Sequence, residues 1–166
     1  MASWIKDFQK GFEQDMIRAL RDLGIAAMKD AYAKKRFTNR TGNLHDSYAC
    51  AVYVRGELVK STVRYLDNPI STKRDQKTKK NGHQTAHDYL YGHSFTSKKD
   101  DFILVVIAAM YYAGILEREP HYINVISPAR DYIDSNWKSA TSQVFNKYGI
   151  KDKPTARVIK GDPLRR

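Results

Sequence analysis

The 166-residue sequence contains a single cysteine, Cys50, and no long apolar run. One cysteine excludes an intrachain disulfide and a zinc site made of cysteines alone. The longest stretch without a charged side chain, residues 102–116, is interrupted by Gly114 and is shorter than the roughly 20 apolar residues that a membrane-spanning helix needs. The first residues contain no continuous apolar segment of the kind found in secretory signals. We therefore expect a soluble globular protein of a reducing compartment, with no membrane partner.

Sequence signatures of metal and phosphate binding are also missing. The chain has no glycine-rich phosphate loop and no His-Glu-x-x-His sequence. His83 and His87 have the i, i+4 spacing of zinc ligands only if their segment is helical, and Asn81-Gly82 disfavours a helix there. With His93 and Asp88 close by, a metal site is the alternative, but we interpret these histidines as solvated side chains of a polar loop.

The carboxylates and the cysteine predict no catalytic centre either. Asp100-Asp101, with Glu117 and Glu119, would suit a metal-dependent nuclease, but no nuclease motif with a catalytic lysine accompanies them. Cys50 shares one face of a predicted strand with apolar neighbours, which is typical of an inert buried thiol. The sequence therefore predicts no catalytic residues, no metal and no cofactor, in a protein that is not an enzyme.

Negative charge is scarce: 29 Lys and Arg face 18 Asp and Glu, for a net charge of +11. Nine of these eleven net charges fall in residues 73–80 and 147–166. Both segments are expected to be mobile, which favours flexible basic arms over a shaped basic groove. Their cations are the candidate contacts to DNA or to an acidic partner: Lys73, Arg74, Lys77, Lys79, Lys80, Arg157, Lys160, Arg165 and Arg166.

Two helices are well marked in the sequence. Apolar side chains recur every three or four residues and predict one long helix over residues 3–37, with this apolar stripe: Phe8, Phe12, Met16, Ala19, Leu23 and Ala27. Gly11 and Gly24 lie inside that helix and predict a bend or a close helix contact. The second helix begins with Ser127 as its N-cap and Pro128 at its first position, and it stops at Gly149.

The strands are predicted between these helices. Residues 48–54 and 58–66 form a hairpin around the turn Arg55-Gly56-Glu57. The uncharged run at 102–108 predicts a buried central strand, and residues 122–126 predict a further short one. Residues 70–100 lack an apolar period and predict a long mobile insertion with a short ordered piece at 86–91.

The order of these elements predicts an α+β fold. It comprises a long N-terminal helix, an antiparallel sheet of about four strands covered on one face, and a C-terminal helix packed on the sheet. Residues 1–149 would form one domain and residues 150–166 a basic C-terminal arm. A partner subunit could cover the open sheet edges or the open face.

Three short motifs occur in order along this framework. Arg40-Thr41-Gly42-Asn43-Leu44 and Ser47 follow the first helix, Tyr112 and Glu117 follow the strand at 102–108, and Pro128 opens the last helix. The series resembles the tail-completion, or neck, proteins of tailed bacteriophages, which have an Arg-Thr-Gly-x-Leu-x-x-Ser turn, a Tyr-Ala-x-x-x-Glu segment and a Pro-Ala helix start. The chain departs from that family in its long basic insertion and in Arg118-Glu119-Pro120, where the family has a glycine-rich turn.

The resemblance implies a structural virion protein, assembled in the host cytoplasm, that forms a homo-oligomeric ring at the head–tail junction. Its partners would be copies of itself, the portal or connector, and tail proteins, with genomic DNA in the central channel. The charge alone supports an alternative, a sequence-independent nucleic-acid-binding protein that uses its basic arms.

Elementary chemistry adds expectations for the motif residues. Gly42 would allow a positive φ at the reversal from helix to strand. Thr41, Asn43 and Ser47 could satisfy backbone groups that the helix end leaves open. Arg40 could form an ion pair with Glu117, within or between subunits.

Overall fold

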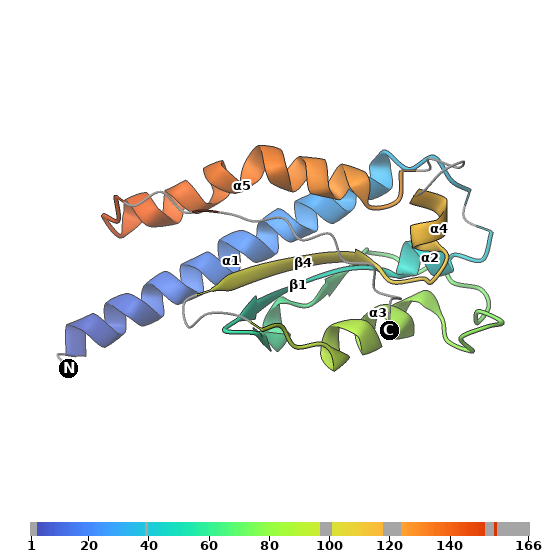
Figure 1. The fold of residues 1–166 in the computed structure, drawn as a ribbon, viewed down its shortest axis with the longest axis horizontal. Helices are drawn as coiled ribbons and strands as arrows, with labels where there is room; N and C mark the ends of the chain where they lie inside the picture. The colour runs from blue at the N-terminus through green and yellow to red at the C-terminus, as the bar shows by residue number, and fades with distance from the viewer. Residues whose placement is uncertain (1–2, 39, 97–100, 118–123, 152–154, 156–166) are drawn as a thin grey trace.

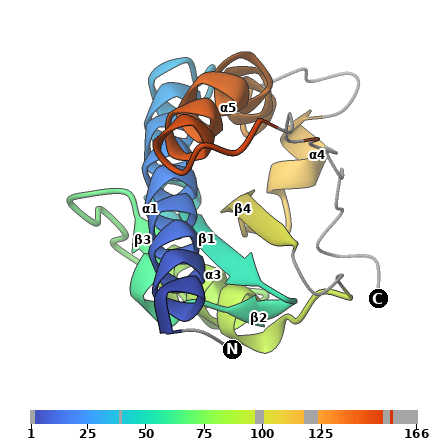
Figure 2. The same ribbon diagram turned by 90° about the vertical axis from the view of Figure 1, so that its left-hand side faces the viewer.

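The computed structural model describes residues 3–38, 40–96, 101–117, 124–151 and 155, and these form the predicted α+β fold. Three layers are visible in Figures 1 and 2: α1 and α5 lie on one side of a four-stranded antiparallel sheet, and α3 lies on the other. The elements are α1 (Ser3–Ala33), α2 (Asn43–Asp46), β1 (Tyr48–Val54), β2 (Glu57–Leu58), η1 (Lys60–Thr62), β3 (Arg64–Tyr65), α3 (Gly82–Gly92), β4 (Phe102–Ala108), α4 (Ala113–Glu117) and α5 (Ser127–Lys147).

Strand β1 is the centre of the sheet and has the predicted bounds. All seven of its residues are buried, because both faces of the strand are covered. Side chains alternate across a strand, so Tyr48, Cys50 and Val52 pack toward α1 while Ala49 and Tyr53 pack toward α3. The hydroxyl of Tyr53 donates to the Leu90 carbonyl oxygen at 2.6 Å, which gives this buried phenol its partner.

Strand β4 has the predicted bounds but not the predicted central position. It runs antiparallel to β1 over its whole length, from Tyr48 opposite Ala108 to Val54 opposite Phe102. Within the described part of the chain it pairs with no other strand, so β4 is an edge strand and most of its side chains are only half-buried. A continuous apolar run indicates cover on both faces of a strand, but it does not report how many neighbouring strands there are.

The predicted strand at residues 58–66 is broken in two. Its ends pair with β1 as β2 and β3, and the 3₁₀ turn η1 separates them. The cause is Thr62, whose hydroxyl donates to the Val59 carbonyl at 2.6 Å and accepts the Val52 N–H at 2.9 Å. This side chain takes a place in the ladder that backbone would otherwise fill. The tight turn was predicted correctly, since Arg55 and Gly56 have φ values of 55° and 84°.

The two glycines of α1 mark close contacts. The sequence predicted a bend or a close helix contact; Gly11 lies against the C-cap residue of α5, whereas Gly24 contacts the sheet. A Cβ at Gly24 would lie 2.8 Å from the Leu104 Cδ1 and 3.2 Å from the Cys50 Sγ, so the glycine lets the helix lie directly on β1 and β4. A Cβ at Gly11 would lie 2.8 Å from the Tyr148 hydroxyl, just beyond the end of α5. The helix itself ends at Ala33, four residues before the predicted end.

Helix α5 packs mainly along α1, whereas we expected it on the sheet (Figure 1). The rings of Phe12, Phe145 and Tyr148 meet edge to face, with centroids 5.4 and 5.5 Å from Phe12. Asp15 accepts hydrogen bonds from the Lys147 Nζ at 2.6 Å and the Tyr148 hydroxyl at 2.9 Å. Because α1 already occupies that sheet face, α5 finds its apolar partner on the helix. Its C-terminal stop at Gly149, with φ of 65°, was predicted correctly.

Helix α3 overturns two predictions. The segment predicted as a mobile loop contains eleven helical residues, and α3 covers the sheet face that we expected to be open. Asn81 caps the helix by accepting the Gln84 N–H at 2.8 Å, while the Gln84 side chain accepts the Asn81 N–H at 3.2 Å. Ala86 and Leu90 are fully buried against β1.

Some predictions fall outside the described residues. Tyr122 and Ile123 of the predicted short strand lie there, and residues 124–126 form no strand. Of the C-terminal arm, only residues 150, 151 and 155 are described. The four basic arm residues that were candidate DNA contacts also lie outside: Arg157, Lys160, Arg165 and Arg166.

Candidate functional site: three motif segments at one end of the sheet

The three motif segments meet at the end of the sheet where β1 begins and β4 ends (Figure 1). The Ser47 carbonyl accepts the Ala109 N–H at 3.1 Å, which joins the first segment to the second. The Tyr48 hydroxyl donates to the Val125 carbonyl at 2.5 Å, which joins it to the third. One core cluster unites the segments through these side chains: Leu44, Tyr48, Met110, Ala113, Val125 and Ala129.

Gly42 has the positive φ that its position predicted, at 76°. A second constraint was not predicted. A Cβ on Gly42 would lie 2.4 Å from the Ile70 carbonyl oxygen and 2.7 Å from the Ser71 nitrogen. The neighbouring Thr41 carbonyl accepts the Thr72 N–H at 3.0 Å. The turn at residues 40–47 therefore contacts residues 70–72, the beginning of the insertion, and holds them in place.

The polar side chains of the turn act partly as expected. Ser47 donates from its hydroxyl to the Leu44 carbonyl at 2.8 Å, a local bond of the predicted kind. Asn43 is different, because its side-chain oxygen accepts the N–H of Gly82 at 3.1 Å, 39 residues further along the chain. Asn43 is 2 % exposed, so this bond is shielded from water. The turn thus holds both the beginning of the insertion and the first residue of α3.

Asp46 completes this attachment, and the sequence analysis did not single it out. Its carboxylate accepts the N–H groups of Ile70 at 2.9 Å and Ser71 at 2.8 Å, and the His45 Nδ1 lies 2.6 Å from it. A carboxylate can only accept, so this histidine nitrogen carries the proton. Burial by itself raises the pKa of Asp46, but the hydrogen bonds from Ser71, His45 and Ile70 outweigh burial and lower it.

Asp46 should make the stability of the fold sensitive to acid. Because its pKa in the folded state is lowered from the usual 3.8, the carboxylate stabilises the fold above that value, and the stabilisation is lost as the pH falls through the folded-state pKa. Urea unfolding between about pH 5 and about pH 2 should show this loss in the natural chain and a smaller one in Asp46→Asn. Asp134→Asn, a change on the exposed face of α5, is the control; equal acid sensitivity in all three proteins would contradict the assignment.

Glu117 lies at the start of α5 instead of pairing with Arg40. Its carboxylate accepts the backbone N–H groups of Val125 at 2.6 Å, Ile126 at 3.1 Å and Ser127 at 2.7 Å. Ser127 opens α5, and its N–H is one of those that the first turn of a helix leaves without partners, while Val125 and Ile126 immediately precede the helix. A negative charge there also complements the helix dipole. Ser127 was predicted to be the N-cap, but it is the first helical residue and Glu117 performs the capping from a distance.

The three remaining motif residues, Arg40, Pro128 and Tyr112, differ in how far they are buried. Arg40 is exposed and forms no ion pair with Glu117 in the part of the chain that the structure describes. Pro128 is buried in the first turn of α5, as its position predicted. Burial, followed by the nearby carboxylate of Asp75, raises the pKa of Tyr112 to about 12. The phenol of Tyr112 is therefore a half-buried neutral group.

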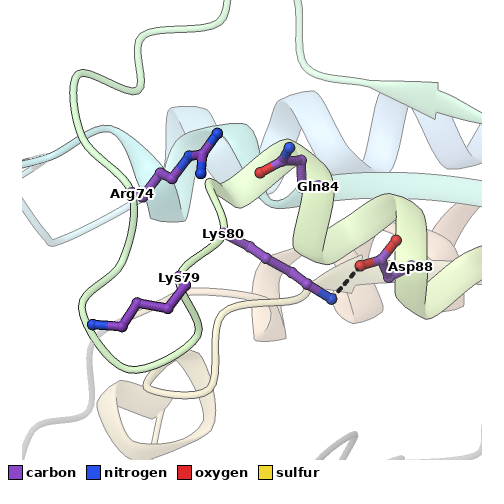
Figure 3. A pocket seen from close by; sticks show the side chains of 5 residues that line it. All are labelled: Arg74, Lys79, Lys80, Gln84 and Asp88. Carbon is purple, nitrogen blue, oxygen red and sulfur yellow. Dashed lines mark hydrogen bonds and ion pairs between the residues drawn. The ribbon is translucent and has the colours of Figure 1, made fainter.

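The five cations predicted in the insertion all lie on one exposed loop, residues 73–80. This loop lies against the motif end of the molecule, because the Lys77 Nζ lies 4.5 Å from the ring centre of Tyr111. Beside α3 the loop forms an open cavity of about 190 Å³, lined by Arg74, Lys79, Lys80, Gln84 and Asp88 (Figure 3).

The candidate metal ligands are engaged in ring contacts instead. His83 lies against Tyr65, and His93 stacks on Tyr89, with ring centres 4.0 Å apart in both pairs. In the described ranges, no three His, Cys, Asp or Glu side chains form a group that could hold a metal ion.

Burial raises the pKa of the Cys50 thiol to about 12, which makes it a poor nucleophile. No helix in those ranges is both long and apolar enough to span a bilayer.

Comparison of the chain with protein-family models, with curated proteins and with solved structures finds no match.

Proposed function

We propose that this protein is a structural subunit of a homo-oligomeric ring at the head–tail junction of a tailed bacteriophage, where it joins the portal or connector to the tail around the DNA channel. The ordered motif series in the sequence supports the phage assignment. Its segments also lie together in space, since Gly42, Tyr112, Glu117 and Pro128 all belong to one end of the molecule. In this proposal, the end of the molecule where the motif segments meet is a structural framework, and it holds in place the surfaces through which neighbouring subunits would associate.

The main structural support for a ring is the unpaired edge of β4 in the described residues. The Ala109 N–H bonds to Ser47 and the Arg55 N–H bonds to Asp101, and these pairs fix the alternation of the antiparallel ladder. The odd-numbered residues of β4 therefore point their backbone groups toward β1, and the even-numbered ones point theirs outward. The outward residues are Phe102, Leu104, Val106 and Ala108.

An edge of this composition is unusual for a monomer. All seven residues of β4 are apolar, with no lysine, proline or bulge to prevent another strand from pairing. In the described residues, nothing pairs with its outer side. Exposed apolar edges of this kind serve strand addition, in which backbone hydrogen bonds supply affinity. We expect a neighbouring subunit to occupy this edge.

The opposite edge of the sheet indicates how copies would associate. It consists of two strands of two residues each, with η1 between them, and offers no matching continuous ladder. Two copies therefore cannot extend the sheet from β4 of one copy to the opposite edge of the next. In the proposed ring, a different surface of the neighbour meets β4, which makes the contact head-to-tail, and such contacts close into a ring when the rotation between subunits allows it. Pairing of β4 with β4 of a second copy is the competing arrangement and would give a two-fold dimer.

A proline in β4 tests this proposal. Val106→Pro removes an N–H that points away from β1, so the pairing of β1 with β4 should survive while the outer edge loses a donor. Electron microscopy and sedimentation of the purified chain should show rings, alone or with its connector partner, and Val106→Pro should abolish them. Circular dichroism should show that the variant keeps its helices.

Leu104→Pro is a second variant of the same kind, for the case in which proline at 106 unfolds the chain. Ile107→Pro is the matched control, because its N–H points into the ladder with β1 and its loss should unfold the protein. A chain that remains monomeric with every connector partner, or one that stops at a two-fold dimer, would contradict the ring.

A further inference from the structure

The basic loop at residues 73–80 is a closed turn, whereas we expected a flexible arm. Asp75 and Lys80 close it, since the Asp75 N–H donates to the Lys80 carbonyl at 2.9 Å. The Asp75 carboxylate accepts the N–H groups of Lys77 at 2.9 Å and Thr78 at 2.8 Å. Lys79 has a φ of 58°, in the left-handed region, and its side chain is exposed. The cations are therefore presented from a defined backbone.

The charges of this loop are only partly compensated. Lys80 is paired with Asp88 of α3 at 2.5 Å, which lowers the pKa of that carboxyl group and keeps it ionised. Lys77 lies over a tyrosine ring. Arg74 and Lys79 have no carboxylate partner in the part of the chain that the structure describes. In Figure 3, Lys80 extends along the cavity toward Asp88, whereas Lys79 extends away from it.

An exposed aromatic stack adjoins this cavity on α3. Gln84 and Asp88 line the cavity, and His87 and Tyr91 share their helix face, because residues three, four and seven apart lie on one side of a helix. The rings of His87 and Tyr91 are stacked, 14° from parallel, with centres 4.2 Å apart. Tyr91 is 43 % exposed although it is a large aromatic side chain. The histidine therefore stacks against one face of the tyrosine ring, while much of the tyrosine side chain remains exposed.

We propose that the loop at 73–80 and the outer face of α3 form one binding site for single-stranded nucleic acid. Arg74 and Lys79 would contact successive backbone phosphates, and a base would stack on the Tyr91 ring. Cations beside an exposed flat ring are the combination with which proteins hold single strands without regard to sequence. An acidic protein surface would use the cations but not the ring. A duplex keeps its bases stacked inside and offers none to Tyr91.

This site does not depend on ring formation, and it assigns the basic charge of the insertion to a definite surface. It also gives the oriented His87–Tyr91 pair a role that packing does not explain, since both side chains are exposed. The buried Asn43–Gly82 hydrogen bond fixes the start of helix α3 next to the loop at 73–80. The Tyr91 side chain and the cations of the loop therefore keep their relative positions.

Fluorescence anisotropy with a labelled oligothymidylate of about 15 nucleotides tests the site. Arg74→Gln with Lys79→Gln should weaken binding about tenfold at low salt and reduce the slope of log affinity against log salt by about 1.4. Lys6→Gln with Lys10→Gln removes two exposed cations from α1, on the other side of the sheet, and should leave both quantities nearly unchanged. An equal loss in the two double variants would overturn the site, since it would reflect net charge alone.

The aromatic part is tested separately. Tyr91→Ala should weaken oligothymidylate binding about tenfold, while Tyr91→Phe should retain it and neither change should affect binding of inorganic polyphosphate. Unchanged binding by Tyr91→Ala would overturn the proposal. So would a duplex of the same length that binds as tightly as the single strand, or poly-glutamate that competes as well as unlabelled oligothymidylate.

Discussion

Replacing Gly82 by alanine should detach α3 from the turn at residues 40–47. A Cβ at this position would lie 1.9 Å from the Asn43 carbonyl oxygen and 2.8 Å from the Ser47 nitrogen. Both are backbone atoms of a buried turn, so neither can rotate away as a side chain could. The overpacking and the loss of the buried Gly82–Asn43 hydrogen bond should together lower the free energy of unfolding by about 4 kcal/mol.

Gly92→Ala is the matched control for this change. Gly92 ends the same helix, and nothing lies within 4 Å of a Cβ there. Alanine should therefore be neutral, or stabilise the chain by up to about 1 kcal/mol through its helix propensity. Urea unfolding of the two variants measures the difference, and hydrogen exchange should show lost protection in α3 of Gly82→Ala. Equal stability of the two variants would contradict the attachment described above.

Removing the Glu117 carboxylate should loosen the start of α5. In Glu117→Ala, the N–H groups of Val125, Ile126 and Ser127 lose their acceptor together, in a partly buried position. Loss of charge-assisted bonds at a helix N-terminus should reduce the free energy of unfolding by about 3 kcal/mol. Glu117→Gln keeps an acceptor oxygen but not the charge, so its effect should be about half as large.

Glu57→Ala, at an exposed position beside the hairpin turn, controls for the removal of a negative charge and should change stability by less than about 0.5 kcal/mol. Urea denaturation gives the three free energies, and hydrogen exchange locates the change. Protection should fall first in the opening turn of α5. If it fell evenly over the whole chain, the local capping role of Glu117 would be wrong.

The sequence predicted those elements whose signal is local. The bounds of β1 and β4 follow from their apolar patterns, and the end of α5 follows from Gly149. Helix α3 was missed because Asn81-Gly82 resembles a turn. In the structure the same pair starts the helix: Asn81 is its N-cap, and Gly82 is required by the close approach of the turn.

The candidate site was also only half predictable, because only part of it depends on local sequence signals. Gly42 could be identified because its positive φ is a property of one residue. The partners of Asn43, Asp46 and Glu117 could not, because each is a backbone N–H between 8 and 39 residues away. The signal that could have found Asp46 is a carboxylate placed two residues before a strand that is buried on both faces.

The single thiol gives this chain an internal reporter of its own opening. Cys50 is fully buried in β1 beneath Gly24 of α1, so a thiol reagent can reach it only when that helix lifts from the sheet. Helix α3 lies on the other side of β1, and its release leaves the sulfur covered. Labelling kinetics would therefore time the separation of one layer independently of the other, without any added cysteine.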